Sequence, residues 1–95
     1  MIIGAGHIRV AAAERNLFLT RSQQAINLGR ATAGCHDFVV AADPVDPKRV
    51  TVYERCANAA VLYAFRGNGP GDELNALVLS WHVNEYDARQ RVPER

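Results

Sequence analysis

The chain has 95 residues, of which 48% are hydrophobic and 22% charged, and its formal net charge is +1. This length fits a single domain spanning residues 1–95, and the apolar fraction argues against wholesale disorder. The small net charge predicts no nucleic-acid partner and no attraction to anionic membranes. No apolar run approaches the roughly 20 residues that span a bilayer. The N-terminus also lacks the pattern of a signal peptide, so a cytoplasmic protein is expected.

The first part of the chain predicts a strand, a long helix and a second strand. Residues 2–10 read as a strand whose glycines allow another group to approach closely. Residues 11–32 read as a helix, and Gly34 supplies its left-handed stop. Residues 35–42 read as the second strand, and their apolar run at residues 38–42 is typical of a strand buried on both sides. The positions near one face of the predicted helix are Leu17, Phe18, Ala25, Ile26 and Gly29.

A turn, a strand and a second helix are expected next. Residues 43–48 contain two prolines, which favour a turn, and residues 49–56 alternate as the second strand of a hairpin. Asn58 is placed to cap a helix that Gly67 ends. Asp72 can cap a shorter helix holding Leu74, Leu77 and Val78.

The last strand is expected at residues 81–89, before a frayed tail at residues 89–95. The order strand, helix, strand, strand, helix, strand predicts an α+β chain with a ferredoxin-like βαββαβ fold. Its four-stranded antiparallel sheet would carry both long helices on one face. Since Phe38 and Val40 would point to one face and Val39 and Ala41 to the other, a monomer would leave an apolar surface in water. Two such faces packed about a twofold axis would remove it, which predicts a homodimer.

Several segments in order resemble the antibiotic-biosynthesis monooxygenase family: IIGAGHIRV, AERNLFL, AGCHDFVVAADPVDPKRV, VYERC and AFRGNGP. The resemblance runs from about Ile2 to Tyr86. It implies a dimeric α/β barrel of ferredoxin-like subunits. It also implies oxidation of quinols or polyketide anthrones by molecular oxygen, with no bound metal, flavin or other cofactor.

Two positions depart from relatives of this kind. Cys56 stands where many relatives carry a tryptophan after the Glu-Arg pair, and this change is expected to reshape the cavity floor. The asparagine and tryptophan of the haem-degrading relatives correspond to His7 and Phe65, and no histidine follows in the next helix. A haem-degrading role is therefore disfavoured.

Oxygenation without a cofactor requires a base, a dry apolar pocket and a donor for the developing oxyanion. His7 is the first candidate for the base because the pKa of histidine suits this task near neutrality. Alternation groups His7 with Ile3 and Ala5, and the resemblance implies that this strand face lines the cavity beneath the helices. The alternative is a core histidine bonded to a backbone carbonyl. His82 fits an interface or surface position and His36 a solvated one, and their spacing predicts no metal site.

Apolar and aromatic side chains are the candidates for binding the substrate. Each has packing as its alternative, and Glu54 and Arg55 are expected to form structural pairs across strands. Tyr63 and Tyr86 are further donor candidates that fit equally well as packing residues. The predicted substrate-binding residues are Phe38, Tyr53, Cys56, Leu62, Phe65 and Trp81.

The two cysteines would oppose each other if the hairpin turn is centred between residues 45 and 46. That register pairs Ala42 with Arg49 and Cys35 with Cys56. It also sets residue 37 opposite residue 54, two like charges, which counts against it. Free thiols are expected in a reducing cytoplasm.

The sequence thus favours a cofactor-independent monooxygenase that oxidises a small aromatic quinol or a polyketide phenol or anthrone with O2. The alternative is a non-catalytic dimeric binding protein for a hydrophobic small molecule, because one fold can serve both functions. Polar groups that converge in the pocket would favour the enzyme, whereas a wholly apolar cavity with His7 buried elsewhere would favour the binding protein.

Overall fold

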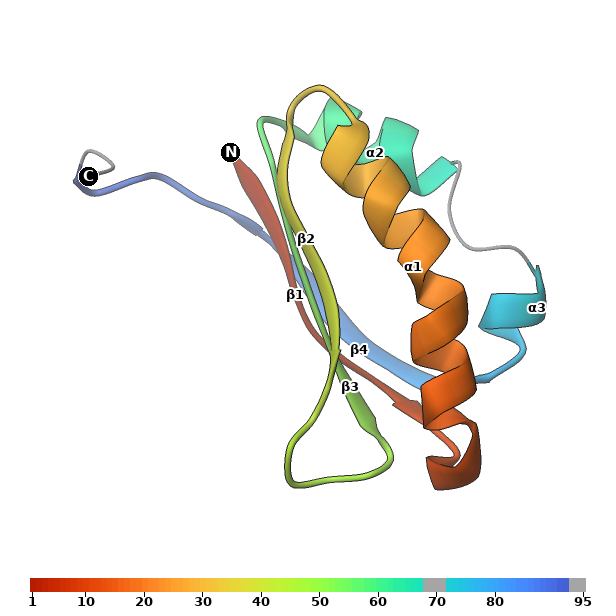
Figure 1. The fold of residues 1–95 in the computed structure, drawn as a ribbon. Coiled ribbons are helices and arrows are strands. Elements are labelled where there is room, and N and C mark those ends of the chain that lie inside the picture. Colours follow the sequence, from red (N-terminus) through yellow and green to blue (C-terminus); the bar gives the residue numbers. More distant parts are fainter. Residues whose placement is uncertain (68–71, 93–95) are drawn as a thin grey trace.

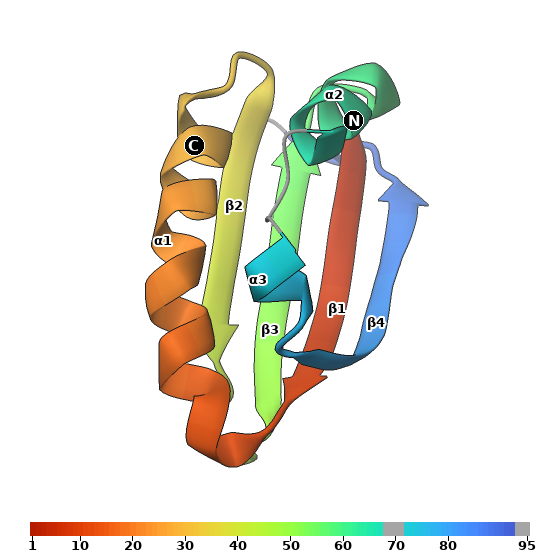
Figure 2. The same cartoon turned by 90° about the vertical axis from the view of Figure 1, so that its right-hand side faces the viewer.

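The computed structural model describes residues 1–67 and 72–92 and contains a four-stranded antiparallel sheet in the order β2-β3-β1-β4 (Figure 1). All three α-helices lie on one face of this sheet, and the other face is uncovered (Figures 1 and 2). The elements are β1 (Ile2–Val10), η1 (Ala12–Glu14), α1 (Arg15–Ala31), β2 (Cys35–Ala42), β3 (Arg49–Cys56), α2 (Ala59–Gly67), α3 (Asp72–Asn75) and β4 (Val78–Asp87).

This arrangement confirms the predicted α+β, ferredoxin-like βαββαβ fold. The bounds of β1, β2 and β3 are the predicted ones, and Asn58 caps α2 as expected, since its Oδ1 accepts the Val61 N–H at 3.0 Å. The side chain of Asp72, which was expected to cap a helix, and the tail residues 93–95 lie outside the part of the chain that the structure describes. None of the described helices has the length and apolar character needed to cross a membrane.

Three expectations about the elements were wrong. A separate 3₁₀ turn precedes α1, so the helix begins at Arg15 rather than at residue 11. The last strand begins at Val78 because α3 is a single turn that ends at Asn75. The apolar run in β2 is not buried on both sides within the subunit, because β2 is an edge strand and Val39 is 38% exposed.

The core lies between the sheet and the helices, and even-numbered residues of β1 and β3 supply its sheet side. Ile8 and Val50 are almost completely buried, and they pair directly across β1 and β3. One buried cluster consists of Ile8, Val10, Phe18, Val50 and Leu74, and a second consists of Ile2, Cys56 and Leu62. Because side chains alternate along a strand, the odd-numbered residues of β1 and β3 point to the uncovered face.

The register of the β2–β3 hairpin differs from the predicted one by one residue, since Ala42 pairs with Val50 and not with Arg49. An irregularity between Cys35 and Asp37 then shifts the pairing back, so that Cys35 still faces Cys56. As a result Asp37 opposes Arg55 instead of Glu54. The like-charge clash that argued against the cysteine pairing does not arise.

Gly6 shows the close approach that glycines in the first strand predicted. Its φ is +152°, and a Cβ there would lie 1.9 Å from the backbone oxygen of His82 on β4. Any side chain at this position would force β1 and β4 apart.

Candidate functional site

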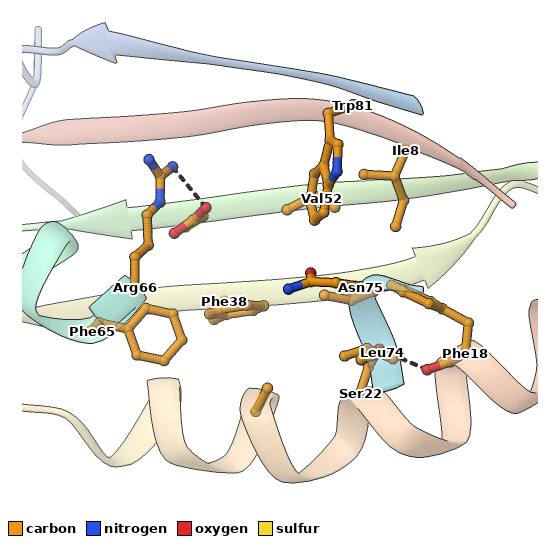
Figure 3. Close-up of a pocket in the computed structure, with 13 residues that line it drawn as sticks. Ile8, Phe18, Ser22, Phe38, Val52, Phe65, Arg66, Leu74, Asn75 and Trp81 are labelled. Atoms are coloured by element: carbon orange, nitrogen blue, oxygen red, sulfur yellow. Dashed lines mark hydrogen bonds and ion pairs between the residues drawn. The ribbon is translucent and has the colours of Figure 1, made fainter. Parts of the chain in front are cut away.

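A pocket of about 370 Å³ lies between the helices and the covered face of the sheet. Its volume is within the range of small-molecule sites, and most of its wall is apolar. All four strands and the three described α-helices contribute residues to the pocket, so that segments far apart in the sequence form one wall (Figure 3). The lining residues are Ile8, Phe18, Ser22, Ala25, Phe38, Val40, Val52, Glu54, Phe65, Arg66, Leu74, Asn75 and Trp81.

Two phenylalanines close one side of the pocket against α1. The rings of Phe38 and Phe65 pack edge to face, with centroids 5.0 Å apart and an interplanar angle of 87°. Gly29 on α1 makes room for both, because a Cβ there would lie 2.7 Å from Phe38 Cδ2 and 3.0 Å from Phe65 Cζ. Trp81 of β4 lines the pocket while remaining 58% exposed, which places it at the rim.

Glu54 on β3 supplies a carboxylate to this mostly apolar pocket. Only 6% of the residue is exposed. Its Oε1 accepts a hydrogen bond from Arg66 Nη2 at 3.0 Å, whereas its Oε2 is buried without a hydrogen-bond partner. A buried acceptor without a donor is unfavourable, and a ligand that brings a hydroxyl or another N–H or O–H group would satisfy it.

Arg66 links Glu54 to a second carboxylate, Glu85 on β4, with which it also forms an ion pair. The Tyr63 hydroxyl donates to Glu85 Oε2 at 2.8 Å. Gly4 of β1 pairs with both glutamates and leaves room for the guanidinium, since a Cβ at Gly4 would lie 3.0 Å from Arg66 Nη2. These side chains form a hydrogen-bonded network that runs from the exposed Tyr63 to Glu54 in the pocket.

The pKa shifts within this network follow from its hydrogen bonds. Burial alone lowers the pKa of Arg66, but its bonds to Glu54 and Glu85 outweigh that effect and raise the pKa above the usual value. The hydrogen bonds from Tyr63 and Arg66 lower the pKa of Glu85, and the bond to Glu85 raises the pKa of Tyr63. Arg66 therefore remains a cation beside the pocket.

Ser22 adds a second acceptor to the pocket lining. Its hydroxyl donates to the Phe18 carbonyl at 2.7 Å, so its single proton is already used (Figure 3). The oxygen of Ser22 and Oε2 of Glu54 can still accept. These two acceptors favour a ligand with an apolar body and at least one acidic or donating hydroxyl group.

The structure brings three of the predicted substrate-binding residues to the pocket, namely Phe38, Phe65 and Trp81. The other three lie elsewhere. Cys56 and Leu62 belong to the second buried cluster, where they pack with Ile2. Tyr53 occupies an odd-numbered position of β3 and points to the uncovered face.

His7 does not line the pocket, and the expectation that its strand face does so was wrong. Its neighbour Ile8 lines the pocket instead, so His7 lies on the uncovered face of the sheet. There it stacks on His82, with ring centroids 4.7 Å apart and an interplanar angle of 19°. Burial lowers the pKa of His7, and the charges of Arg49 and His82 lower it further.

Glu54 is the site residue that the sequence reasoning missed. Its signal lies in the alternation of β3, where Val50, Val52, Glu54 and Cys56 share one face. A carboxylate at a core-facing position among apolar residues suggests a functional group. Its partner Arg66 lies on a different element, and no local pattern reveals that contact. In the described part of the chain no three His, Cys, Asp or Glu side chains gather as a metal site would require.

No family model matches the sequence, and a search of curated proteins found no match. Solved structures with the same fold include three described as "putative antibiotic biosynthesis monooxygenase". The one from Deinococcus radiodurans is 18% identical, with a TM-score of 0.85 over 100% of this chain and 99% of that chain. The one from Nitrosomonas europaea is 14% identical, with a TM-score of 0.83 over 93% and 98%. The one from Caulobacter crescentus is 15% identical, with a TM-score of 0.82 over 94% and 90%.

The TM-scores show a shared fold, and the resemblance to this family implied the same ferredoxin-like fold. The alignments cover nearly the full length of both chains, so the shared fold extends over the whole chain in each case. One fold can carry unrelated functions, so the function must be argued from the pocket.

Proposed function

We propose that the protein is a cofactor-independent monooxygenase that oxidises a small aromatic quinol or a polyketide phenol or anthrone with O2. The observation that carries this proposal is the buried Oε2 of Glu54, an acceptor without a partner in an apolar pocket. The resemblance in sequence and the names of the structural neighbours support the same reaction class.

In this proposal Glu54 takes the place first considered for His7. The substrate hydroxyl, or an acidic C–H group in an anthrone, donates to Oε2 and transfers its proton there. The guanidinium of Arg66, held against the other oxygen of Glu54, offsets the negative charge that develops on the substrate. The aromatic walls exclude water and hold the ring system in place.

The electron-rich anion passes an electron to O2, and recombination forms the new carbon–oxygen bond. For an anthrone, the methylene carbon loses two hydrogens and gains one oxygen atom as a ketone, while the second oxygen atom leaves as water. For a quinol, the products that balance are a hydroxyquinone and water. Both routes use O2 as the only oxidant.

We also propose that the protein acts as a homodimer formed through the uncovered face of the sheet. The middle of this face carries uncharged side chains, including Ala5, Val39 and Tyr53, which lie side by side on neighbouring strands. The charged residues lie toward its ends and are already paired, as in the bridge between Arg55 and Asp37 at 2.7 Å. A second copy would remove the apolar middle from water without breaking those ion pairs.

The test is oxygen uptake by the purified protein with a panel of reduced quinones and anthrones, without added metal or flavin. We expect uptake above the spontaneous rate. Glu54→Gln should reduce the enzymatic rate by about 100-fold or more, because general-base catalysis contributes on this scale and the amide cannot accept the proton. His7→Gln is the matched control on the opposite face of the sheet, and it should retain the rate.

Three outcomes separate the alternatives. Loss of activity in His7→Gln with full activity in Glu54→Gln would transfer the role of the base back to His7. No uptake with any panel member would contradict the monooxygenase. If one panel member bound tightly without being oxidised, the proposal of a monooxygenase would give way to that of a binding protein for hydrophobic small molecules.

A further inference from the structure

Cys35 and Cys56 face each other at the end of the β2–β3 pair, and their Sγ atoms lie 2.9 Å apart. The Ala57 N–H donates to the Gly34 carbonyl at 2.7 Å, which closes the ladder beside the two cysteines. In an antiparallel pair, opposed residues next to such a bond have Cα atoms about 4.5 Å apart. That spacing is within the range that a disulfide spans, so bond formation would need little backbone movement.

The two thiols differ in their access to solvent. Cys56 is 1% exposed and packs with Ile2 and Leu62, whereas Cys35 is partly exposed at the start of an edge strand. Burial, and next the contact with Cys35, raise the pKa of Cys56 to about 12. Cys56 therefore remains a thiol at neutral pH, and a dissolved oxidant meets Cys35 first.

We propose that Cys35 and Cys56 form a redox modification site, in which a peroxide converts the two thiols into an intramolecular disulfide between β2 and β3. The sulfur of Cys35 attacks the peroxide O–O bond, which gives a sulfenic acid and releases one water from hydrogen peroxide. The sulfur of Cys56 then displaces the hydroxyl group of that sulfenic acid. The S–S bond forms, a second water leaves, and the two electrons have passed from the thiols to the peroxide.

This site is separate from the pocket and does not depend on the proposed function. Neither cysteine lines the pocket. The disulfide would nevertheless fix the chain just before α2, which begins at Ala59 and carries Phe65 and Arg66 to the pocket wall. A link across the hairpin constrains the unfolded chain and so should stabilise the fold.

The test uses the full chain, fully reduced and then exposed to a small excess of hydrogen peroxide. The protein is denatured, alkylated with iodoacetamide and weighed by mass spectrometry. We expect a species that has lost two hydrogens and takes up no label, and a digest in which the peptides containing Cys35 and Cys56 are joined. Its melting temperature should rise by several degrees, and dithiothreitol should reverse both changes.

Cys35→Ser and Cys56→Ala serve as separate controls, and each should lose the internal link. Cys35→Ser keeps the buried side chain of Cys56, so this control does not depend on repacking the core. Two results would overturn the proposal. One is that both thiols remain open to alkylation while methionine or other groups oxidise. The other is that Cys35 proceeds to sulfinic acid, or joins another chain, while Cys56 stays free.

Discussion

Arg66 Nη2 lies 3.0 Å from Glu54 Oε1, and this ion pair joins α2 to the centre of the sheet at the wall of the pocket. The side chain of Glu54 is 8% exposed and that of Arg66 34%. Arg66→Met would therefore leave a buried carboxylate without a partner on either oxygen. We expect a loss of about 2 kcal/mol in the free energy of unfolding, measured by urea denaturation, since the partly exposed arginine makes the effect smaller than in a fully buried pair.

Two comparisons make this prediction specific. Arg55→Met breaks the more exposed pair with Asp37 and should cost less than about 1 kcal/mol. The double variant Glu54→Leu/Arg66→Met should recover most of the lost stability, because it removes the buried charge as well. Equal losses for Arg55→Met and Arg66→Met would contradict the view that burial of Glu54 dominates.

Gly29 lies where α1 meets the rings of Phe38 and Phe65. Alanine is a better helix former than glycine by about 1 kcal/mol, but its Cβ would lie 2.7 Å from Phe38 Cδ2. We expect Gly29→Ala to destabilise the protein by about 1 kcal/mol in net terms, since overpacking costs about 1–3 kcal/mol. The exposed Asn27 on the same helix provides the control, and Asn27→Ala should stabilise slightly. A more stable Gly29→Ala variant would show that the two rings move aside freely.

His7 makes the stability depend on pH. Its pKa in the folded protein is below the usual 6.5, so below pH 6.5 the unfolded chain binds a proton that the folded chain does not. Stability should therefore decrease as the pH falls from about 6.5 toward 5, and it should change little above that range. The free energy of unfolding at several pH values tests this, at one fixed protein concentration.

The other groups with lowered pKa titrate in a different range. Asp43 and Asp46 accept backbone hydrogen bonds that lower their pKa values, and the pKa of Glu85 is lowered by Tyr63 and Arg66. Their contribution is lost only at more acidic pH, below their usual values near 4. His7→Gln should flatten the dependence of the free energy of unfolding on pH between pH 5 and 6.5, and it should leave the dependence at lower pH unchanged. An unchanged slope in that variant would assign the dependence to another group.

The hairpin shows how far the sequence could predict the structure. Strand bounds followed from alternation and turn residues, which are local signals. The register did not, because the one-residue shift at Ala42 is compensated by the irregularity before Asp37. That irregularity is favoured by a contact between strands, the ion pair of Asp37 with Arg55, which no local pattern encodes. The facing of Cys35 and Cys56 was thus predicted correctly from a register that is wrong elsewhere.

The site was harder to predict than the fold. Alternation alone grouped His7 with Ile3 and Ala5, but it could not decide which face of the sheet the helices cover. The burial of Ile8 and Val50 decides it, and His7 then lies outside the pocket. Aromatic walls such as Phe38 and Phe65 were predictable because large apolar side chains near the core have few other places to go.

The uncovered face gives the last prediction, which concerns the proposed dimer. Ala5 lies in the middle strand pair of the sheet, between Tyr53 on β3 and Asn84 on β4. A charge at this position would be buried between two facing sheets, whereas a single subunit would leave it in water. We expect light scattering after size exclusion to show a dimer for the wild type and a monomer for Ala5→Glu. Val45→Glu, in the hairpin turn where Val45 is 89% exposed, should remain dimeric. A dimeric Ala5→Glu variant with an intact circular dichroism spectrum would place the interface on another surface.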